Sequence, residues 1–271
     1  MESDKPRIVS GWFNGFTTGA PLTIVFHNKD TKSTDYIDIK EHPRPGHADF
    51  VARQKFGGFN DYRGGGHFSG RLTLGLVAAG VVAKKILPNL SINALLIEAG
   101  GNSDIMEAVN KAVELNDSIG GIVECRAGYL SVGYGEPFFD SVESVISHLA
   151  FSIPAIKGIE FGSGFSSSKM YGSQHNDPII DETGKTSSYN AGGITGGLTN
   201  GNELVFRVAV KPTSSIFKKQ QSYNFSSGQV DDLVIVGRHD TCIALRVPVV
   251  LEAITAIAIA DFTLISKKKQ R

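Results

Sequence analysis

The chain has 271 residues, of which 41% are hydrophobic and 20% charged, as in an ordinary globular protein. A chain of this length can bury a substantial core in one large domain. Lys and Arg together number 27 and are balanced by 27 Asp and Glu, so bulk charge gives no support for a nucleic-acid or membrane surface. Any affinity for anions must come from local clusters of residues.

Cysteine occurs only at Cys125 and Cys242, without CxxC spacing, which indicates two buried, reduced thiols rather than a disulfide or a metal pair. No set of His and carboxylates has a metal-ligand spacing, so we predict no protein-held metal site. The N-terminal MESDKPR does not resemble a signal peptide. The longest apolar run, 247–265, contains Glu252 and Asp261, which indicates a buried helix rather than a membrane span.

Short β-branched or aliphatic segments alternate with longer segments of helical spacing. The pattern predicts strands at 22–26, 94–98, 121–125, 158–161, 204–210 and 233–236, and helices at 71–87, 103–115, 140–149 and 248–265. Ser103 and Asp140 are placed to open their helices, and Pro248 suits a first turn. The polar stretch 174–191 is expected to be a long exposed loop. We predict one α/β domain over residues 1–271, with helices packed between or against sheets.

Two pairs of glycines lie between Tyr189 and Gly201, in YNAGGITGGLTNG. Paired glycines let the backbone approach a ligand and offer N–H groups to an anion, although a plain glycine-rich turn remains an alternative. A predicted strand then leads into Lys211–Ser215, where an ammonium group and three hydroxyls suit a phosphate or the polar edge of a flavin. The spacing is neither that of a P-loop nor that of a Rossmann fingerprint.

Ionisable residues gather in three further loops. Gly237–Cys242 places Arg, His and Asp in a row after a predicted strand, where an Arg can bind an anion and an Asp can act as a base, or the two can form a salt-bridged loop. Arg44–Asp49 and Asp61–Arg71 combine Arg, His and Gly shortly before a helix. His47 and His67 in these loops are candidates for function, while a structural role remains possible.

Taken together and in this order, the motifs resemble those of the chorismate synthases over nearly the whole chain. The matching stretches are RPGHADF (44–50), DYRGGGHFSGR (61–71), VAAGVVAKKIL (77–87), DSIGGIVEC (117–125), GYGEPFFD (133–140), SIPAIKGIEFGSGF (152–165), GSQHNDP (172–178), NAGGITGGLTNG (190–201), RVAVKPTSSI (207–216) and GRHDTC (237–242).

The resemblance implies a cytoplasmic, homotetrameric lyase of the shikimate pathway of aromatic amino acid biosynthesis. Such enzymes convert 5-enolpyruvylshikimate 3-phosphate to chorismate and phosphate by a net 1,4-elimination. They require reduced FMN, and NADP is also associated with the family. The implied fold is a β-α-β sandwich of the α+β type, with helices between two antiparallel sheets. No reductase-like domain is visible in the chain, so we expect an external source of reduced FMN, and we expect neither a nucleic-acid nor a membrane partner.

Carried over residue by residue, the resemblance also implies a flavin site. Its members would be His67, Phe68, Ser69, Pro154, Ala155, Gly196, Lys211, Pro212, Thr213, Ser214, Ser215 and Arg238. The family more often has Arg-Ser-Ser where this chain has His67-Phe68-Ser69, and we expect this substitution to weaken or reshape one phosphate or flavin contact. Arg71 would face the anionic groups of the substrate.

For the chemistry, the resemblance implies two residues. His47 matches the histidine of the GHAD motif and would donate a proton to reduced flavin or to the departing phosphate. Asp240 matches the aspartate of GRHD and would assist removal of the C6 proton together with flavin N5.

The chain departs from the family pattern in two places. An opening segment with a GESHG motif and an RRRPG-type stretch does not occur, and the family usually has more residues after Gly101. Two interpretations remain open. Either these segments belong to a longer protein that is a complete enzyme, or the chain is a truncated, non-catalytic protein of the same fold that binds FMN or a phosphate ligand.

Overall fold

The centre of the molecule is a four-stranded antiparallel sheet with the strand order β5-β6-β10-β7. We describe it from a computed structural model, which covers residues 4–27, 38–235, 237 and 239–269. The strands are β5 (Ser91–Ala99), β6 (Gly121–Gly128), β7 (Ile156–Phe161) and β10 (Leu204–Val210).

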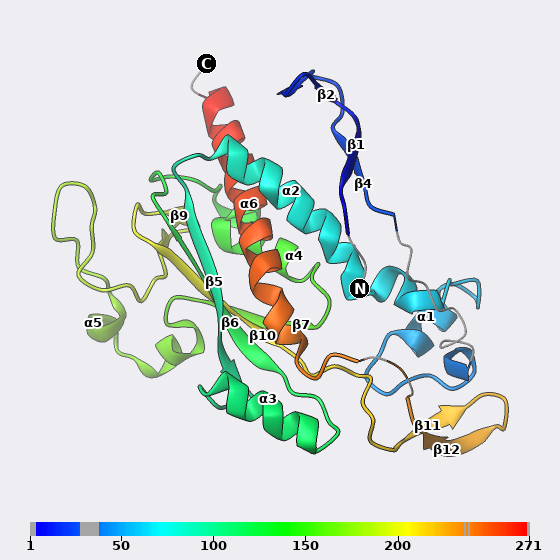
Figure 1. Ribbon diagram of the computed structural model, residues 1–271. Coiled ribbons are helices and arrows are strands. Elements are labelled where there is room, and N and C mark those ends of the chain that lie inside the picture. Colours follow the sequence, from blue (N-terminus) through cyan, green and yellow to red (C-terminus); the bar gives the residue numbers. More distant parts are fainter. Residues whose placement is uncertain (1–3, 28–37, 236, 238, 270–271) are drawn as a thin grey trace.

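Three helices cover one face of this sheet: α2 (Thr73–Ile86), α4 (Val142–Ala150) and α6 (Val247–Lys269). Figure 1 shows α2 and α6 crossing the sheet side by side. The inward side chains of β6 and β10, such as Val123 and Phe206, are fully buried with Leu251 and Ile254 of α6. This burial of alternate strand residues against apolar helix faces supplies most of the core.

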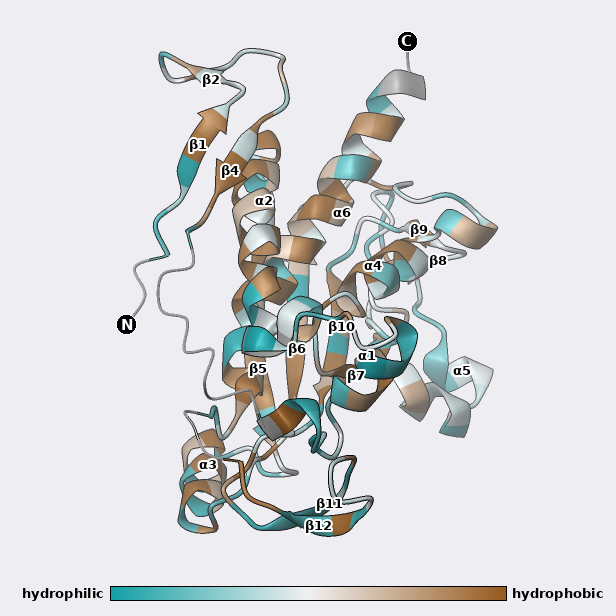
Figure 2. Cartoon of the chain, turned by 90° about the vertical axis from the view of Figure 1, so that its right-hand side faces the viewer, coloured by the Kyte–Doolittle hydropathy of each residue, from teal (hydrophilic) through white to brown (hydrophobic). Residues whose placement is uncertain are grey.

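Helix α6 is long and apolar enough to cross a membrane, with a hydropathy of 2.0 over its most apolar window. However, 61% of that window is buried inside the fold. Figure 2 shows its apolar residues running along the centre of the molecule. The arrangement is that of a core helix.

The other face of the sheet carries charged residues in alternation with the buried ones. Arg207 Nε lies 2.8 Å from Glu124 Oε2, and Arg126 Nε lies 2.7 Å from Glu124 Oε1. Arg126 also pairs with Glu203 at 2.9 Å. A sheet with one apolar and one ion-paired face is typical of antiparallel strands that pack on only one side.

The remaining strands form two-stranded pairs. These are β1 (Arg7–Ser10) with β4 (Thr23–Val25), β2 (Trp12–Phe13) with β3 (Phe16–Thr17), β8 (Ile194–Thr195) with β9 (Leu198–Thr199), and β11 (Gln220–Asn224) with β12 (Gln229–Leu233). In both views, α2 lies between the β1–β4 pair and the rest of the core (Figures 1 and 2). Short helical segments complete the fold: η2 (Asp38–Lys40), α1 (Asp49–Lys55), η3 (Arg63–Phe68), η4 (Gly70–Leu72), α3 (Ile105–Glu114), η5 (Phe138–Asp140), η6 (Gly164–Lys169), α5 (Gly172–His175) and η7 (Ile243–Arg246).

The predicted α+β class is confirmed, and the predicted strand 204–210 matches β10 at both ends. The helix starts differ by one or two residues. Asp104 caps α3, accepting a hydrogen bond of 3.0 Å from the backbone N–H of Glu107, and Ser141 caps α4 in the same way through Ser144. The predicted strand 233–236 was wrong, since β12 ends at Leu233 and Val236 lies outside the described residues.

Both cysteines are buried, as predicted. Burial raises the pKa of the Cys125 thiol to about 12, so this group stays protonated and unreactive at neutral pH.

Candidate active site

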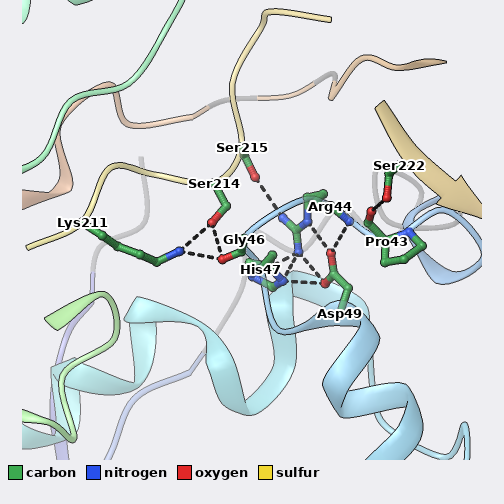
Figure 3. A network of polar contacts seen from close by, with 9 residues as sticks. All are labelled: Pro43, Arg44, Gly46, His47, Asp49, Lys211, Ser214, Ser215 and Ser222. Atoms are coloured by element: carbon green, nitrogen blue, oxygen red, sulfur yellow. Dashed lines mark hydrogen bonds and ion pairs between the residues drawn. The ribbon is translucent and has the colours of Figure 1, made fainter. Parts of the chain in front are cut away.

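The segment after β10 turns across the end of the sheet and meets a loop from the first fifth of the chain. The Lys211 backbone N–H donates to the carbonyl of Ala155 at 2.9 Å, which fixes the start of the turn. The Lys211 ammonium then donates to the Gly46 carbonyl at 2.6 Å and to Ser214 Oγ at 2.9 Å, and Ser214 Oγ donates to the same carbonyl at 2.8 Å (Figure 3). Gly46 has a φ of 69°, a conformation that L side chains rarely adopt.

Lys211 carries its charge without an ion pair among the described residues. Burial lowers the pKa of its ammonium group, and the positive charge of Lys157 on β7 lowers it further. Lys157 follows buried Ile156, the register partner of Val210, so both lysines stand at the same end of the sheet. Two neighbouring ammonium groups, neither of which forms an ion pair within the described part of the chain, favour an anionic ligand.

Arg44 joins the same loop to the end of the Lys211–Ser215 segment. Its buried guanidinium donates to Asp49 through Nε at 2.7 Å and through Nη2 at 2.8 Å, which is a bidentate ion pair. A third nitrogen, Nη1, donates to Ser215 Oγ at 3.0 Å. Figure 3 shows Arg44 between these two partners, so one side chain fixes the distance between the two segments.

His47 contacts this ion pair. Its Nδ1 lies 2.6 Å from Asp49 Oδ1, and 21% of its side chain is exposed. Burial would raise the pKa of the Asp49 carboxyl, but the hydrogen bonds from Arg44 and His47 outweigh burial and hold it well below its ordinary value. Asp49 is therefore a carboxylate at any physiological pH.

Asp240 lies beside the same segment, since its backbone carbonyl accepts a hydrogen bond of 2.8 Å from Thr213 Oγ1. Its carboxylate is engaged by Arg246, with Nε to Oδ2 at 2.9 Å and Nη2 to Oδ1 at 2.8 Å. A carboxylate in a bidentate ion pair with a guanidinium is a weak proton acceptor. Asp240 can act as a base only when this pair opens.

Next to Asp240, the His239 ring packs 5.4 Å from the ring of Phe217. Burial lowers the pKa of this imidazole below its ordinary value, so His239 is neutral at physiological pH.

The other predicted flavin contacts divide into two groups. Pro154 and Ala155 precede β7 and touch the start of Lys211–Ser215 through the Ala155 carbonyl. His67, Phe68 and Ser69 belong to the η3–η4 region, where Ser69 Oγ accepts from the Arg71 backbone N–H at 3.3 Å and thereby caps η4. Arg71, His67 and Phe68 are exposed. No hydrogen bond between described residues joins η3 or η4 to the Lys211–Ser215 segment.

No hydrogen bond between described residues joins Gly196 to this cluster. Gly196 lies in the turn between β8 and β9, which precedes β10, whereas Lys211 follows β10. The carbonyl of Gly197, next to Gly196, instead accepts a hydrogen bond of 2.9 Å from the backbone N–H of Val142 at the start of α4. Arg238 lies outside the described residues.

The residues that hold the cluster together are ones that the sequence did not single out individually. Arg44 and Asp49 flank His47 in RPGHAD, a spacing that lets all three meet within one loop. Lys157 stands in SIPAIKG, where an isolated lysine in an apolar segment was the only signal.

The sequence of this chain is similar to those of known proteins. The chorismate synthase family model matches residues 1–264. A chorismate synthase of Chitinophaga pinensis is 61% identical over 271 residues, which cover 100% of this chain and 82% of that protein. One of Dehalococcoides mccartyi is 44% identical over 294 residues, covering 97% of this chain and 81% of that protein.

The family usually has more residues after Gly101, and the lengths of these alignments show whether each relative has residues that this chain lacks. The Chitinophaga protein matches all 271 residues over an alignment of the same length, whereas the Dehalococcoides alignment is longer than the part of this chain that it covers. The Chitinophaga protein therefore has no insertion relative to this chain over the aligned range, whereas the Dehalococcoides protein has inserted residues.

A crystal structure of chorismate synthase has a TM-score of 0.73 to this fold at 24% identity, covering 96% of this chain and 78% of that chain. That likeness shows the fold alone. With a family model over nearly the whole chain and a curated relative at 61% identity, this chain belongs to the chorismate synthase family.

Proposed function

We propose that this protein is an FMN-dependent lyase that converts 5-enolpyruvylshikimate 3-phosphate to chorismate and phosphate. The proposal is supported above all by the hydrogen bond from the Lys211 ammonium group to the carbonyl of Gly46, which precedes His47 in the same loop. This contact combines a cation that lacks an ion pair among the described residues with a histidine next to it. Departure of phosphate requires both positive charge and a proton donor.

The residues of this cluster fit FMN as a bound cofactor. Lys211–Ser215 would hold it, together with Pro154 and Ala155, because this segment offers an ammonium group and hydroxyls to anionic or carbonyl oxygens. Reduced FMN, when bound, supplies electron density that eases cleavage of the C–O bond while the net reaction stays redox-neutral.

The side chains of this chain then perform the proton transfers and the charge stabilisation. His47 donates a proton to the departing phosphate, and the ammonium groups of Lys211 and Lys157 stabilise its negative charge. Asp240 accepts the C6 proton after its carboxylate leaves Arg246. In this elimination one C–H bond and one C–O bond break, and one additional double bond forms in the product.

A second candidate function is a protein of the same fold that binds FMN or a phosphate ligand without turnover. The observation in its favour is the bidentate ion pair between Asp240 and Arg246, because it engages both oxygens of the carboxylate proposed as the base.

We also propose a homotetramer that acts in the cytoplasm, without nucleic-acid or membrane partners. Support for an oligomer comes from the β2–β3 pair, where Trp12, Phe13 and Phe16 are 48%, 69% and 77% exposed. Isolated two-stranded ribbons are marginally stable, and exposed aromatic clusters usually meet a partner chain. Light scattering on the purified protein tests this, and a monomer at micromolar concentration would contradict it.

Anaerobic turnover separates the two candidate functions. The lyase releases phosphate from 5-enolpyruvylshikimate 3-phosphate with reduced FMN and not with oxidised FMN. Saturable FMN binding with no phosphate release would favour the binding protein and exclude the lyase.

A further inference from the structure

The contact between His47 and Asp49 determines which ring nitrogen carries the hydrogen. The atoms Nδ1 and Oδ1 are 2.6 Å apart. At this separation a proton must lie between them, because otherwise a nitrogen lone pair would face a carboxylate oxygen. The neutral imidazole therefore carries its hydrogen on Nδ1, and the lone pair is on Nε2.

Arg44 does not compete for this arrangement. Its Nη2 lies 3.0 Å from Nδ1 and 3.2 Å from Nε2 of His47. A donor almost equally distant from both nitrogens lies along neither lone pair, since the two lone pairs diverge from the ring. The guanidinium therefore limits the position of the ring, while the carboxylate of Asp49 selects the tautomer.

Asp49 is itself held firmly enough to orient another group. Three hydrogen bonds from Arg44 reach its carboxylate, from Nε, Nη2 and the backbone N–H, at 2.7, 2.8 and 3.1 Å. Only 13% of its side chain is exposed. The other charged or titratable groups near this loop are Lys211, bonded to Gly46, and His239, whose pKa is affected by Arg44. Among the described residues, neither forms a hydrogen bond with the imidazole.

We propose that Asp49 is a positioning residue that holds His47 as the Nδ1–H tautomer and makes Nε2 the nitrogen that exchanges protons with the substrate. In the imidazolium form both nitrogens carry hydrogen. The Nε2 hydrogen passes to the departing phosphate oxygen, and the ring returns to neutral with Nδ1–H still bonded to Asp49. Asp49 takes up no proton in this step.

Nitrogen NMR of labelled protein tests the tautomer independently of activity. In the wild type, neutral His47 is expected to show a protonated Nδ1 and an unprotonated Nε2. In Asp49→Asn, the ratio of the Nε2–H form to the Nδ1–H form is expected to rise about tenfold, because a hydrogen bond to a charged acceptor is lost. The control Asp181→Asn, in an exposed loop, is expected to leave His47 unchanged. A wild-type Nε2–H tautomer, or an unchanged ratio in Asp49→Asn, would overturn the inference.

Kinetics adds a second readout, and this one depends on the proposed function. Asp49→Asn is expected to lower kcat roughly 10- to 100-fold while KM changes less than about threefold. If the wild type shows the Nδ1–H tautomer but releases no phosphate, the proposed function fails and the inference stands. If the wild type turns over and the tautomer of Asp49→Asn is unchanged, the inference fails alone.

Discussion

The Lys211 ammonium group donates a hydrogen bond of 2.6 Å to the backbone carbonyl of Gly46, although 165 residues separate them in the chain. Because His47 is the next residue after Gly46, this bond places a proton donor beside a cation that lacks an ion pair within the described part of the chain. The approach of the Lys211 ammonium group to the loop that carries His47 underlies the proposed chemistry.

Removal of the Lys211 charge should weaken FMN binding. For Lys211→Met we expect the dissociation constant of FMN to rise roughly 10- to 100-fold, the effect of losing one charged hydrogen bond. A smaller rise is expected for Lys157→Met, because Lys157 is exposed. Calorimetric titration with FMN measures both, with Lys185→Met as a control in a distant loop. Affinity within twofold of the wild type in Lys211→Met would exclude Lys211 from the cofactor site.

The two partners of the Asp240–Arg246 ion pair should behave differently on substitution. Asp240→Asn is expected to lose most turnover, on the order of 100-fold or more, because an amide cannot accept the C6 proton. Arg246→Gln frees the carboxylate and should retain turnover within about threefold of the wild type, or increase it. Steady-state phosphate release measures both variants. Unchanged turnover in Asp240→Asn would remove Asp240 from the mechanism.

Two glycines of α2 should respond oppositely to alanine. A β-carbon at Gly80 would come within 2.4 Å of Ala253 Cβ on α6, whereas one at Gly75 meets nothing within 4 Å. Gly80→Ala should therefore destabilise the protein by about 1–3 kcal/mol through overpacking. Gly75→Ala should stabilise it by about 0.5–1 kcal/mol through helix propensity. Urea unfolding measures both free energies, and equal effects would contradict the packing of α2 on α6.

The lowered pKa of Asp49 predicts how stability depends on pH. A carboxyl whose pKa is lower in the folded state contributes stability above its ordinary value of 3.8, and this contribution is lost as pH falls toward the folded value. Asp49→Asn should therefore lower the free energy of unfolding by about 3 kcal/mol at pH 7, since it leaves buried Arg44 unpaired. The difference from the wild type should shrink below about pH 4. A difference independent of pH would contradict this account of Asp49.

Much of the framework could be predicted from the sequence, because strongly apolar segments determine their own pairing. Leu204–Val210 is an example, with every second side chain buried and both ends correctly placed. The β11–β12 pair was not predicted, since QQSYN and QVDDL are polar and carry no clear alternation. Its position depends on tertiary contacts, such as that of His42 with the Ser222 carbonyl at 3.0 Å.

The candidate site, like the β11–β12 pair, depends on tertiary contacts that the sequence does not reveal. The resemblance implied one flavin site that included both Gly196 and Lys211–Ser215, yet Gly196 lies in the turn between β8 and β9 and no hydrogen bond between described residues joins it to that segment. Conversely, the bond between Arg44 and Ser215 joins residues 171 positions apart, which no local pattern indicates. Residue type indicated the chemistry, but only the fold showed which residues meet.

The most direct test of the central claim is the rate of phosphate release by His47→Gln, measured anaerobically with reduced FMN beside the wild type. His175→Gln, on the exposed helix α5, serves as the control and should match the wild type. If the loop of His47 and the Lys211–Ser215 segment form one active site, His47→Gln should lose roughly 100-fold or more of its rate while it still binds FMN. Phosphate release equal to that of the wild type would contradict the account.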